Sequence, residues 1–123
     1  MLFRSRGVDP VVRRIQKVRP SDVAISAVTV MELRYGATRR QSPKLSAAVE
    51  AFLNDITILT FDAKAAERAG VLRASMEFKG YSIALADCQI AGTALAFDLT
   101  LVTNDSDLMR IPGLKVVDWR SGC

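Results

Sequence analysis

The chain has 123 residues, which is enough for one domain with a substantial hydrophobic core. Half of its residues are hydrophobic, a composition that argues against intrinsic disorder, and no apolar run is long enough to span a membrane. The sequence contains no histidine, which excludes Ser-His-Asp and Cys-His catalysis and histidine-ligated zinc. Any catalysis must therefore depend on carboxylates, lysines or hydroxyl groups.

The charge balance is mildly basic, with 17 Lys and Arg residues against 13 Asp and Glu residues and a net charge of +4. This balance fits a polyanionic partner, although many ordinary enzymes share it. Cys88 and Cys123 are the only cysteines, too few for a disulfide framework or a four-ligand zinc site without histidine. The N-terminus has no signal-peptide pattern, so we expect a cytoplasmic protein.

Short apolar runs alternate with helical patterns along the chain. Met1 to Gly7 has the character of the end of an element, so the chain is expected to open in a helix, and Asp9-Pro10 starts a further helical pattern. The alternation predicts an α/β fold with a parallel sheet covered on both faces. Strands are predicted over residues 23–26, 56–59, 99–103 and 115–117. Helices are predicted to begin at Ala27, at Ser42-Pro43 and after the cap Asp62, and to cover residues 84–97. Trp119 is expected to pack against the core.

Acidic residues fall where predicted strands and helices meet. Asp87 lies in the first turn of the predicted helix 84–97, and Asp105 and Asp107 follow the next strand. Glu32 lies in the helix after the strand 23–26. Sites in open α/β sheets form outside the carboxyl ends of the strands, and clustered carboxylates are costly unless a cation neutralises them, so a divalent metal site is one interpretation. The other is that Glu32 is a surface charge, Asp87 caps its helix, and the remaining acids belong to a polar turn.

Three runs of the sequence, AISAVTVMELRYGA, GYSIALADCQIAGTALAFDLTLVTNDSDL and IPGLKVVDW, resemble a PIN domain, and more narrowly the VapC toxins of toxin–antitoxin pairs. The resemblance extends from about Phe3 to Trp119, so residues 1–123 are interpreted as a single PIN-like domain. It implies an α/β/α sandwich around a parallel sheet and an Mg²⁺- or Mn²⁺-dependent ribonuclease that acts on RNA. It also implies a homodimer and a VapB-like antitoxin that occludes the active site.

Residue by residue, the resemblance assigns metal binding and catalysis to Glu32, Asp87 and Asp105, with Asp107 as an accessory ligand. The family opens with a strand carrying an Asp, whereas Met1 to Phe3 here has the pattern of the interior of the first helix. We therefore expect that the first strand and its Asp are missing and that the domain is truncated at its N-terminus.

Loss of a metal ligand predicts weak metal binding or an inactive chain. Two hypotheses stay open at this point, a VapC-type endoribonuclease toxin and a non-catalytic PIN remnant that binds antitoxin or RNA. A receiver-like phospho-acceptor is a third reading, but the acid pair that it needs after the first strand is not found.

Overall fold

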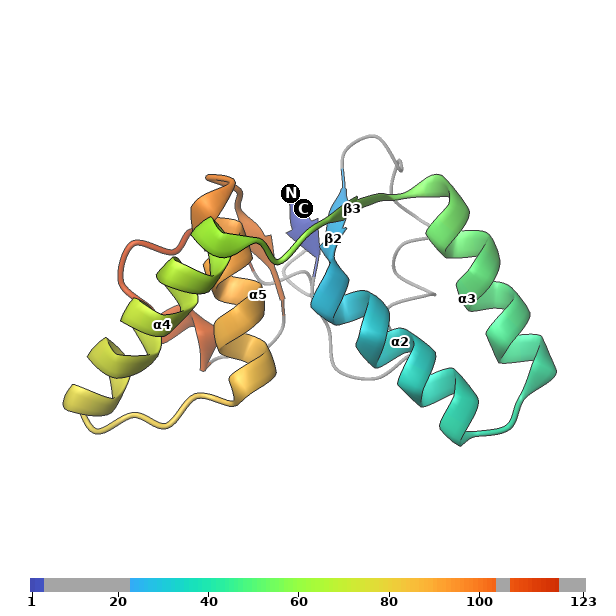
Figure 1. The fold of residues 1–123 in the computed structure, drawn as a ribbon, viewed down its shortest axis with the longest axis horizontal. Helices are drawn as coiled ribbons and strands as arrows, with labels where there is room; N and C mark the ends of the chain where they lie inside the picture. Colours follow the sequence, from blue (N-terminus) through green and yellow to red (C-terminus); the bar gives the residue numbers. More distant parts are fainter. Residues whose placement is uncertain (4–22, 104–106, 118–123) are drawn as a thin grey trace.

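The computed structural model describes residues 1–3, 23–103 and 107–117. Within them, five short strands form one sheet in which every pair is parallel, as predicted. Figure 1 shows helices on both sides of this sheet, which confirms the α/β/α arrangement. The strands are β1 (Leu2–Phe3), β2 (Ala24–Ser26), β3 (Thr57–Leu59), β4 (Leu101–Val102) and β5 (Val116–Val117), and they lie in the order β3-β2-β1-β4-β5.

The prediction that the chain opens in a helix and lacks the first strand is wrong. Leu2–Phe3 is the central strand of the sheet, between β2 and β4. Leu2 pairs in register with Ala24 on one side and Leu101 on the other, and its backbone N–H donates to the carbonyl of Thr100 at 2.9 Å. A central parallel strand needs partners on both edges, and this segment has them, while the Leu2 side chain is fully buried. No residue of β1 is acidic, however, so the strand brings no carboxylate to the sheet.

The helices begin and end close to their predicted positions. Ser26, Ser42 and Asp62 each accept a backbone N–H at a helix start, so Asp62 is a cap, as predicted. The predicted helix at Asp9-Pro10 and the position of Trp119 lie outside the described residues. None of the described helices has the length and apolar character that a membrane crossing requires. The helices are α2 (Ala27–Arg39), α3 (Pro43–Asp55), α4 (Ala63–Phe78) and α5 (Leu85–Ala96), and a short 3₁₀ turn, η2 (Leu108–Arg110), follows β4.

Two hydrophobic clusters hold these elements together. The first cluster joins the sheet to α4 and α5, and its members include Leu2, Leu72, Met76, Ile90 and Leu101. The second cluster joins the sheet to α2 and α3, and its members include Ile25, Leu33, Val49, Leu53 and Val102. Each cluster removes large aliphatic side chains from water, which is the main force that fixes the helices on the sheet.

α4 and α5 approach each other closely at a glycine of α5. A Cβ added to Gly92 would lie 2.7 Å from the carbonyl oxygen of Ala65 and 2.7 Å from the Cβ of Ala69. The two helices lie next to each other in Figure 1, with α4 running down the page and α5 running up. α5 begins at its lower end in Figure 1, so its first turn, which contains Asp87, lies on the side of the lower edge of the sheet.

Candidate functional site

The carboxyl edge of the sheet is the lower edge in Figure 1. Ser26 ends β2 at this edge, and its hydroxyl accepts the backbone N–H of Val28 at 3.0 Å, so α2 starts here. Thr103 directly follows β4 and is fully buried. α5 leads back toward β4 from below, so its first turn reaches the same edge. The positive ends of two helices therefore lie near the ends of parallel strands, an arrangement that favours negative charge.

Asp87 is the most buried acidic side chain among the described residues, with 2% of its surface exposed. It lies in the first turn of α5, where Ala84 provides no side-chain cap. A carboxylate is stabilised at this position by the unpaired N–H groups and the dipole of the helix. Asp87 also has an interaction partner within the protein, so it is not an isolated buried charge. A buried carboxylate held at a helix start is a suitable fixed ligand for a cation.

Glu32 and Asp107 are less buried than Asp87. Glu32 is half-buried in the second turn of α2, about one turn beyond the carboxyl edge. Asp107 lies just before η2, 4.0 Å from the guanidinium of Arg110, and Arg110 lies over the ring of Tyr81 at 5.1 Å from its centroid. Both acids have interaction partners, and Asp105 lies outside the described residues.

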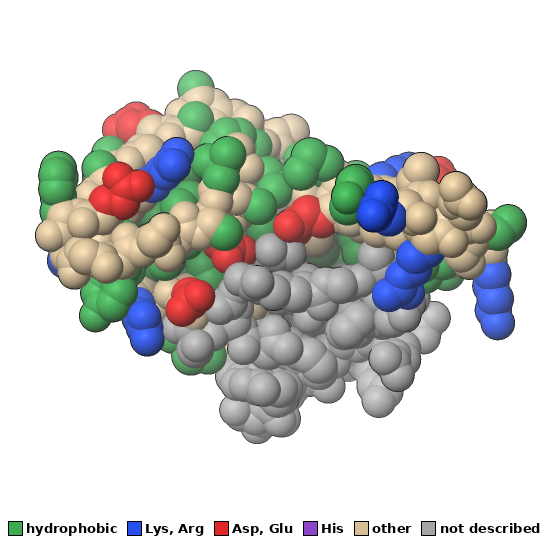
Figure 2. Space-filling model, turned by 90° about the horizontal axis from the view of Figure 1, so that it is seen from below, with side chains coloured by type: hydrophobic (Ala, Val, Ile, Leu, Met, Phe, Trp, Pro, Cys, Tyr) green, Lys and Arg blue, Asp and Glu red, His purple; other side chains and the backbone are tan. Residues whose placement is uncertain are grey.

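The described acids do not form a complete metal cage by themselves. In residues 1–3, 23–103 and 107–117, no group of three or more Asp, Glu, Cys or His side chains is close enough to hold a metal ion. Figure 2 views the molecule from below and shows acidic side chains near the middle of this face, beside the residues that are not described. The four predicted residues thus remain candidates, with Asp87 in the best-defined position.

Thr29 is a feature of this region that sequence reasoning missed. It lies in the first turn of α2 and is 1% exposed, and its hydroxyl has no hydrogen-bond partner in the part of the chain that the structure describes. Buried hydroxyl groups are normally paired, and a catalytic role or an ordered water or ion is among the explanations for an unpaired one. Thr29 precedes Glu32 by three residues, so the two side chains are neighbours along the helix. The sequence offered only a Thr in an apolar run, which gives no sign of an unpaired hydroxyl.

Comparison with known proteins identifies the family. The model of the PIN domain matches residues 1–114, which is most of the chain. The chain belongs to the PIN-domain family. This PIN domain is 36% identical over 120 residues to the tRNA(fMet)-specific endonuclease VapC of Salmonella typhimurium, a match that covers 96% of this chain and 91% of that protein. It is 35% identical over 99 residues to ribonuclease VapC2 of Rickettsia felis, covering 79% and 74% of the two chains.

Solved structures agree with this assignment. The DNA-bound VapBC of Salmonella typhimurium superposes on this PIN domain with a TM-score of 0.81 and 32% identity, covering 97% of this chain and 99% of that one. VapBC2 of Rickettsia felis, bound to a DNA fragment from its promoter, gives a TM-score of 0.77 and 31% identity, with the same coverage. The predicted membership in the VapC branch of the family is confirmed.

Proposed function

We propose that this PIN domain is a VapC-type toxin that hydrolyses phosphodiester bonds of RNA at the carboxyl edge of its sheet. The observation that carries the proposal is the buried carboxylate of Asp87 at that edge. Similarity over nearly the whole chain to a VapC endonuclease supports it. Because the chain has no histidine, the acidic residues are its natural catalytic groups.

We propose Glu32, Asp87 and Asp105 as the residues that hold Mg²⁺ or Mn²⁺, with Asp107 as an accessory. Their donor atoms fit, since Mg²⁺ takes hard oxygen ligands and often uses only one or two carboxylates together with substrate phosphates. A bound divalent cation supplies positive charge that stabilises a phosphate under attack and lowers the pKa of the attacking water.

The protein's own residues have distinct tasks in this proposal. The helix start holds the buried Asp87 carboxylate in one position, which keeps the ligand geometry fixed. Glu32 is half-buried and reaches solvent, so it is placed to accept a proton from a water molecule at the edge of the site. The buried Thr29 hydroxyl is placed to hold an ordered water beside Glu32.

The partners follow from the relatives. One relative is a tRNA(fMet)-specific endonuclease, so we propose a structured RNA such as a tRNA as the substrate class. The superposed structures are VapBC complexes, so we propose that this chain binds a VapB-like antitoxin. We also propose a homodimer, which the resemblance implies.

A second candidate function is a non-catalytic PIN protein that binds antitoxin or RNA. The observation that favours it is β1, whose residues are Leu2 and Phe3 and which brings no acid to the carboxyl edge. Calorimetry with Mg²⁺ separates the two functions, because a non-catalytic protein has no measurable affinity for the metal and a nuclease binds it. Binding that disappears in Asp87→Asn supports the nuclease.

The activity test measures cleavage of a tRNA pool by the purified chain with Mg²⁺ or Mn²⁺, with and without EDTA. Asp87→Asn is expected to lower the rate at least about 10–100-fold, the loss seen when even an outer metal-site residue is removed. Asp62→Asn is the matched control, because it makes the same chemical change at an exposed helix cap and Asn caps a helix as well as Asp. Absence of metal-dependent cleavage by the unsubstituted chain contradicts the proposal.

A further inference from the structure

The hairpin formed by α2 and α3 carries a one-sided charge. Residues 33–49 contain four basic residues and no acidic residue. Arg34 is paired with Glu50 on α3, and Arg39, Arg40 and Lys44 are exposed around the turn between the helices. Gln41 adopts a positive φ of 52° in this turn, and α3 then starts at Ser42. The tip of the hairpin is therefore a local concentration of positive charge.

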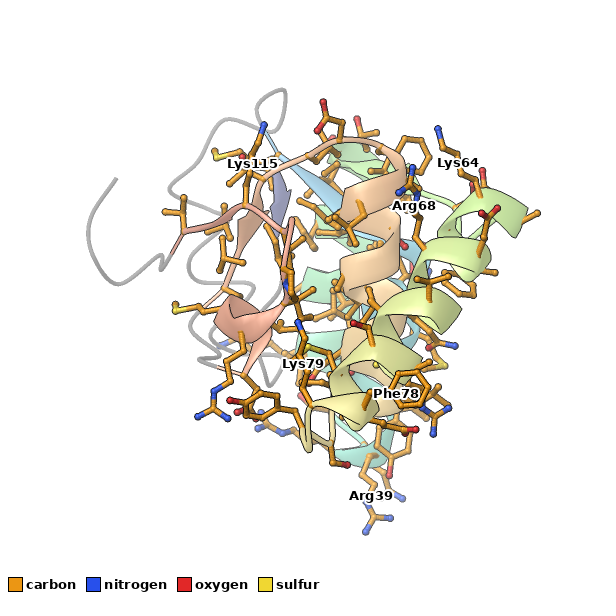
Figure 3. All side chains as sticks on the ribbon, turned by 90° about the vertical axis from the view of Figure 1, so that its left-hand side faces the viewer. Arg39, Lys64, Arg68, Phe78, Lys79 and Lys115 are labelled. Atoms are coloured by element: carbon orange, nitrogen blue, oxygen red, sulfur yellow. The ribbon has the colours of Figure 1, made fainter. Side chains whose placement is uncertain are left out.

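The hairpin tip projects on the side of the candidate site. α2 starts at the carboxyl end of β2 and has 13 residues, so its far end lies about 20 Å beyond the sheet edge. In Figure 3, Arg39 is at the lowest point of the molecule, whereas Lys64 and Arg68 on α4 are at the upper end. A polyanion that lies along α2 can reach both the site and the tip.

An exposed stripe of α2 connects the site with the tip. Met31, Tyr35 and Arg39 recur every four residues, so they lie along one side of the helix. Tyr35 is 66% exposed and Met31 is 60% exposed, so both large side chains are open to solvent. Tyr35 also lies three residues beyond Glu32, which places an aromatic ring one turn from a proposed catalytic residue.

We propose that Tyr35, Arg39 and Lys44 form an RNA track on the hairpin, in which Tyr35 stacks on an unpaired base and the two basic residues bind phosphates beyond it. This inference rests on the proposed ribonuclease function and names residues that hold the substrate outside the reacting centre. Unpaired bases stack on exposed aromatic rings, and phosphates bind Lys and Arg.

RNA fits the hairpin tip better than an acidic protein segment. Protein interfaces depend on a buried apolar centre, whereas the tip is surrounded by small and polar residues such as Thr38, Ser42 and Ser46. Phosphate binding needs no apolar centre, only donors with positive charge.

The test measures binding of a fluorescently labelled tRNA, whose loops supply unpaired bases, in buffer without divalent metal, over a range of salt concentrations. Arg39→Ala with Lys44→Ala is expected to weaken binding about 10-fold and to lower the slope of log K against log salt by about 1 to 2. Tyr35→Ala is expected to weaken binding about 10-fold with an unchanged slope, because the lost side chain carries no charge. Tyr35→Phe is expected to restore binding, because stacking needs the ring and not the hydroxyl.

Two matched controls make the same chemical changes elsewhere. Lys64→Ala with Arg68→Ala removes one Lys and one Arg from α4, and Phe78→Ala removes an aromatic ring that is 89% exposed. Both controls are expected to bind RNA like the unsubstituted chain. Circular dichroism and thermal melts check that every variant is folded.

Each outcome decides the inference. If the hairpin variants bind RNA normally, or if the α4 controls lose as much affinity, the RNA track is wrong while the nuclease proposal stands. If the hairpin variants lose affinity for poly-glutamate but not for RNA, the hairpin tip is a protein-binding surface and the inference is overturned. If the unsubstituted chain binds no RNA, both this inference and the RNA substrate of the proposed function fail.

Discussion

Replacing Thr29 by Val should make the protein more stable and less active. The Thr29 hydroxyl is buried without a hydrogen-bond partner among the described residues, which costs about 1–3 kcal/mol relative to a paired or absent group. Valine has nearly the same shape and places a buried methyl group where the hydroxyl was, which stabilises the fold. Imperfect packing of that methyl group offsets part of the gain. We expect a net gain of about 1–2 kcal/mol in the free energy of unfolding.

A gain of this size is measurable for a domain of 123 residues. It corresponds to a rise in Tm of about 4 °C per kcal/mol, and to a higher urea midpoint without a change in the m-value. The matched control is Thr93→Val on α5, because Thr93 is equally buried but its hydroxyl donates to the carbonyl of Gln89 at 2.8 Å. Thr93→Val removes a formed hydrogen bond and should destabilise the protein by about 0.5–1.5 kcal/mol.

The opposite signs of the two substitutions are the critical result. If Thr29→Val destabilises the protein as much as Thr93→Val, the Thr29 hydroxyl has a partner in solution and the reasoning is refuted. The same variant should cleave RNA more slowly than the unsubstituted chain, because in the proposed function the Thr29 hydroxyl holds a water beside Glu32. Faster or unchanged cleavage would separate Thr29 from the site.

Three further predictions concern packing, thiol chemistry and pH. Gly92→Ala should lower the free energy of unfolding in urea by about 1–3 kcal/mol, because the added Cβ would meet the Ala65 carbonyl oxygen at 2.7 Å. The control Gly70→Ala should not destabilise the protein, because there is open space around the added Cβ. Burial raises the pKa of the Cys88 thiol, so its alkylation should be slow in the folded protein and fast in urea. Mass spectrometry of the peptide that contains Cys88 measures the rate, and fast labelling of the native state contradicts this prediction. The hydrogen bond and charge of Arg34 lower the pKa of Glu50 in the folded protein. The ionised Glu50 carboxylate therefore stabilises the fold above its ordinary pKa of 4.5, and this stabilisation is lost as the pH falls through the lower pKa of the folded state. The free energy of unfolding of Glu50→Gln should therefore differ from that of the unsubstituted chain at neutral pH, and the two should converge in acid. A difference that persists in acid would exclude the Arg34–Glu50 ion pair as its cause.

The sequence predicted most of the fold because its signals were local. The hydroxyl or carboxylate at Ser42 and Asp62 identified two helix starts, and the apolar runs before and after the helices identified β2 to β5. The first strand was mispredicted for a physical reason. Two apolar residues carry no readable periodicity, and their extended conformation is decided by pairing with β2 and β4, which are distant in sequence.

The candidate site, like the fold, has one part that the local sequence predicts and another that depends on tertiary packing. The position of Asp87 at the start of α5 follows from local sequence, because an acid in the first turn of a helix is a recognisable pattern. The burial of Asp87 and the unpaired hydroxyl of Thr29 could not be predicted, because both depend on which side chains pack around them in the folded protein. Whether Asp105 joins the same site stays a prediction.

One helix links the proposed chemistry to the proposed binding of RNA. α2 carries Thr29, Glu32, Tyr35 and Arg39 at steps of three or four residues, so each successive residue lies about one turn farther from the sheet edge. If both proposals hold, substitutions should change character along the helix. Near the sheet edge they should lower kcat, because those side chains contact the reacting groups, and toward the tip they should mainly raise KM and change its salt dependence. A loss of kcat at Arg39 as large as the loss at Glu32 would mean that the hairpin tip contributes to the chemical step itself, and the separation of site and RNA track would be wrong.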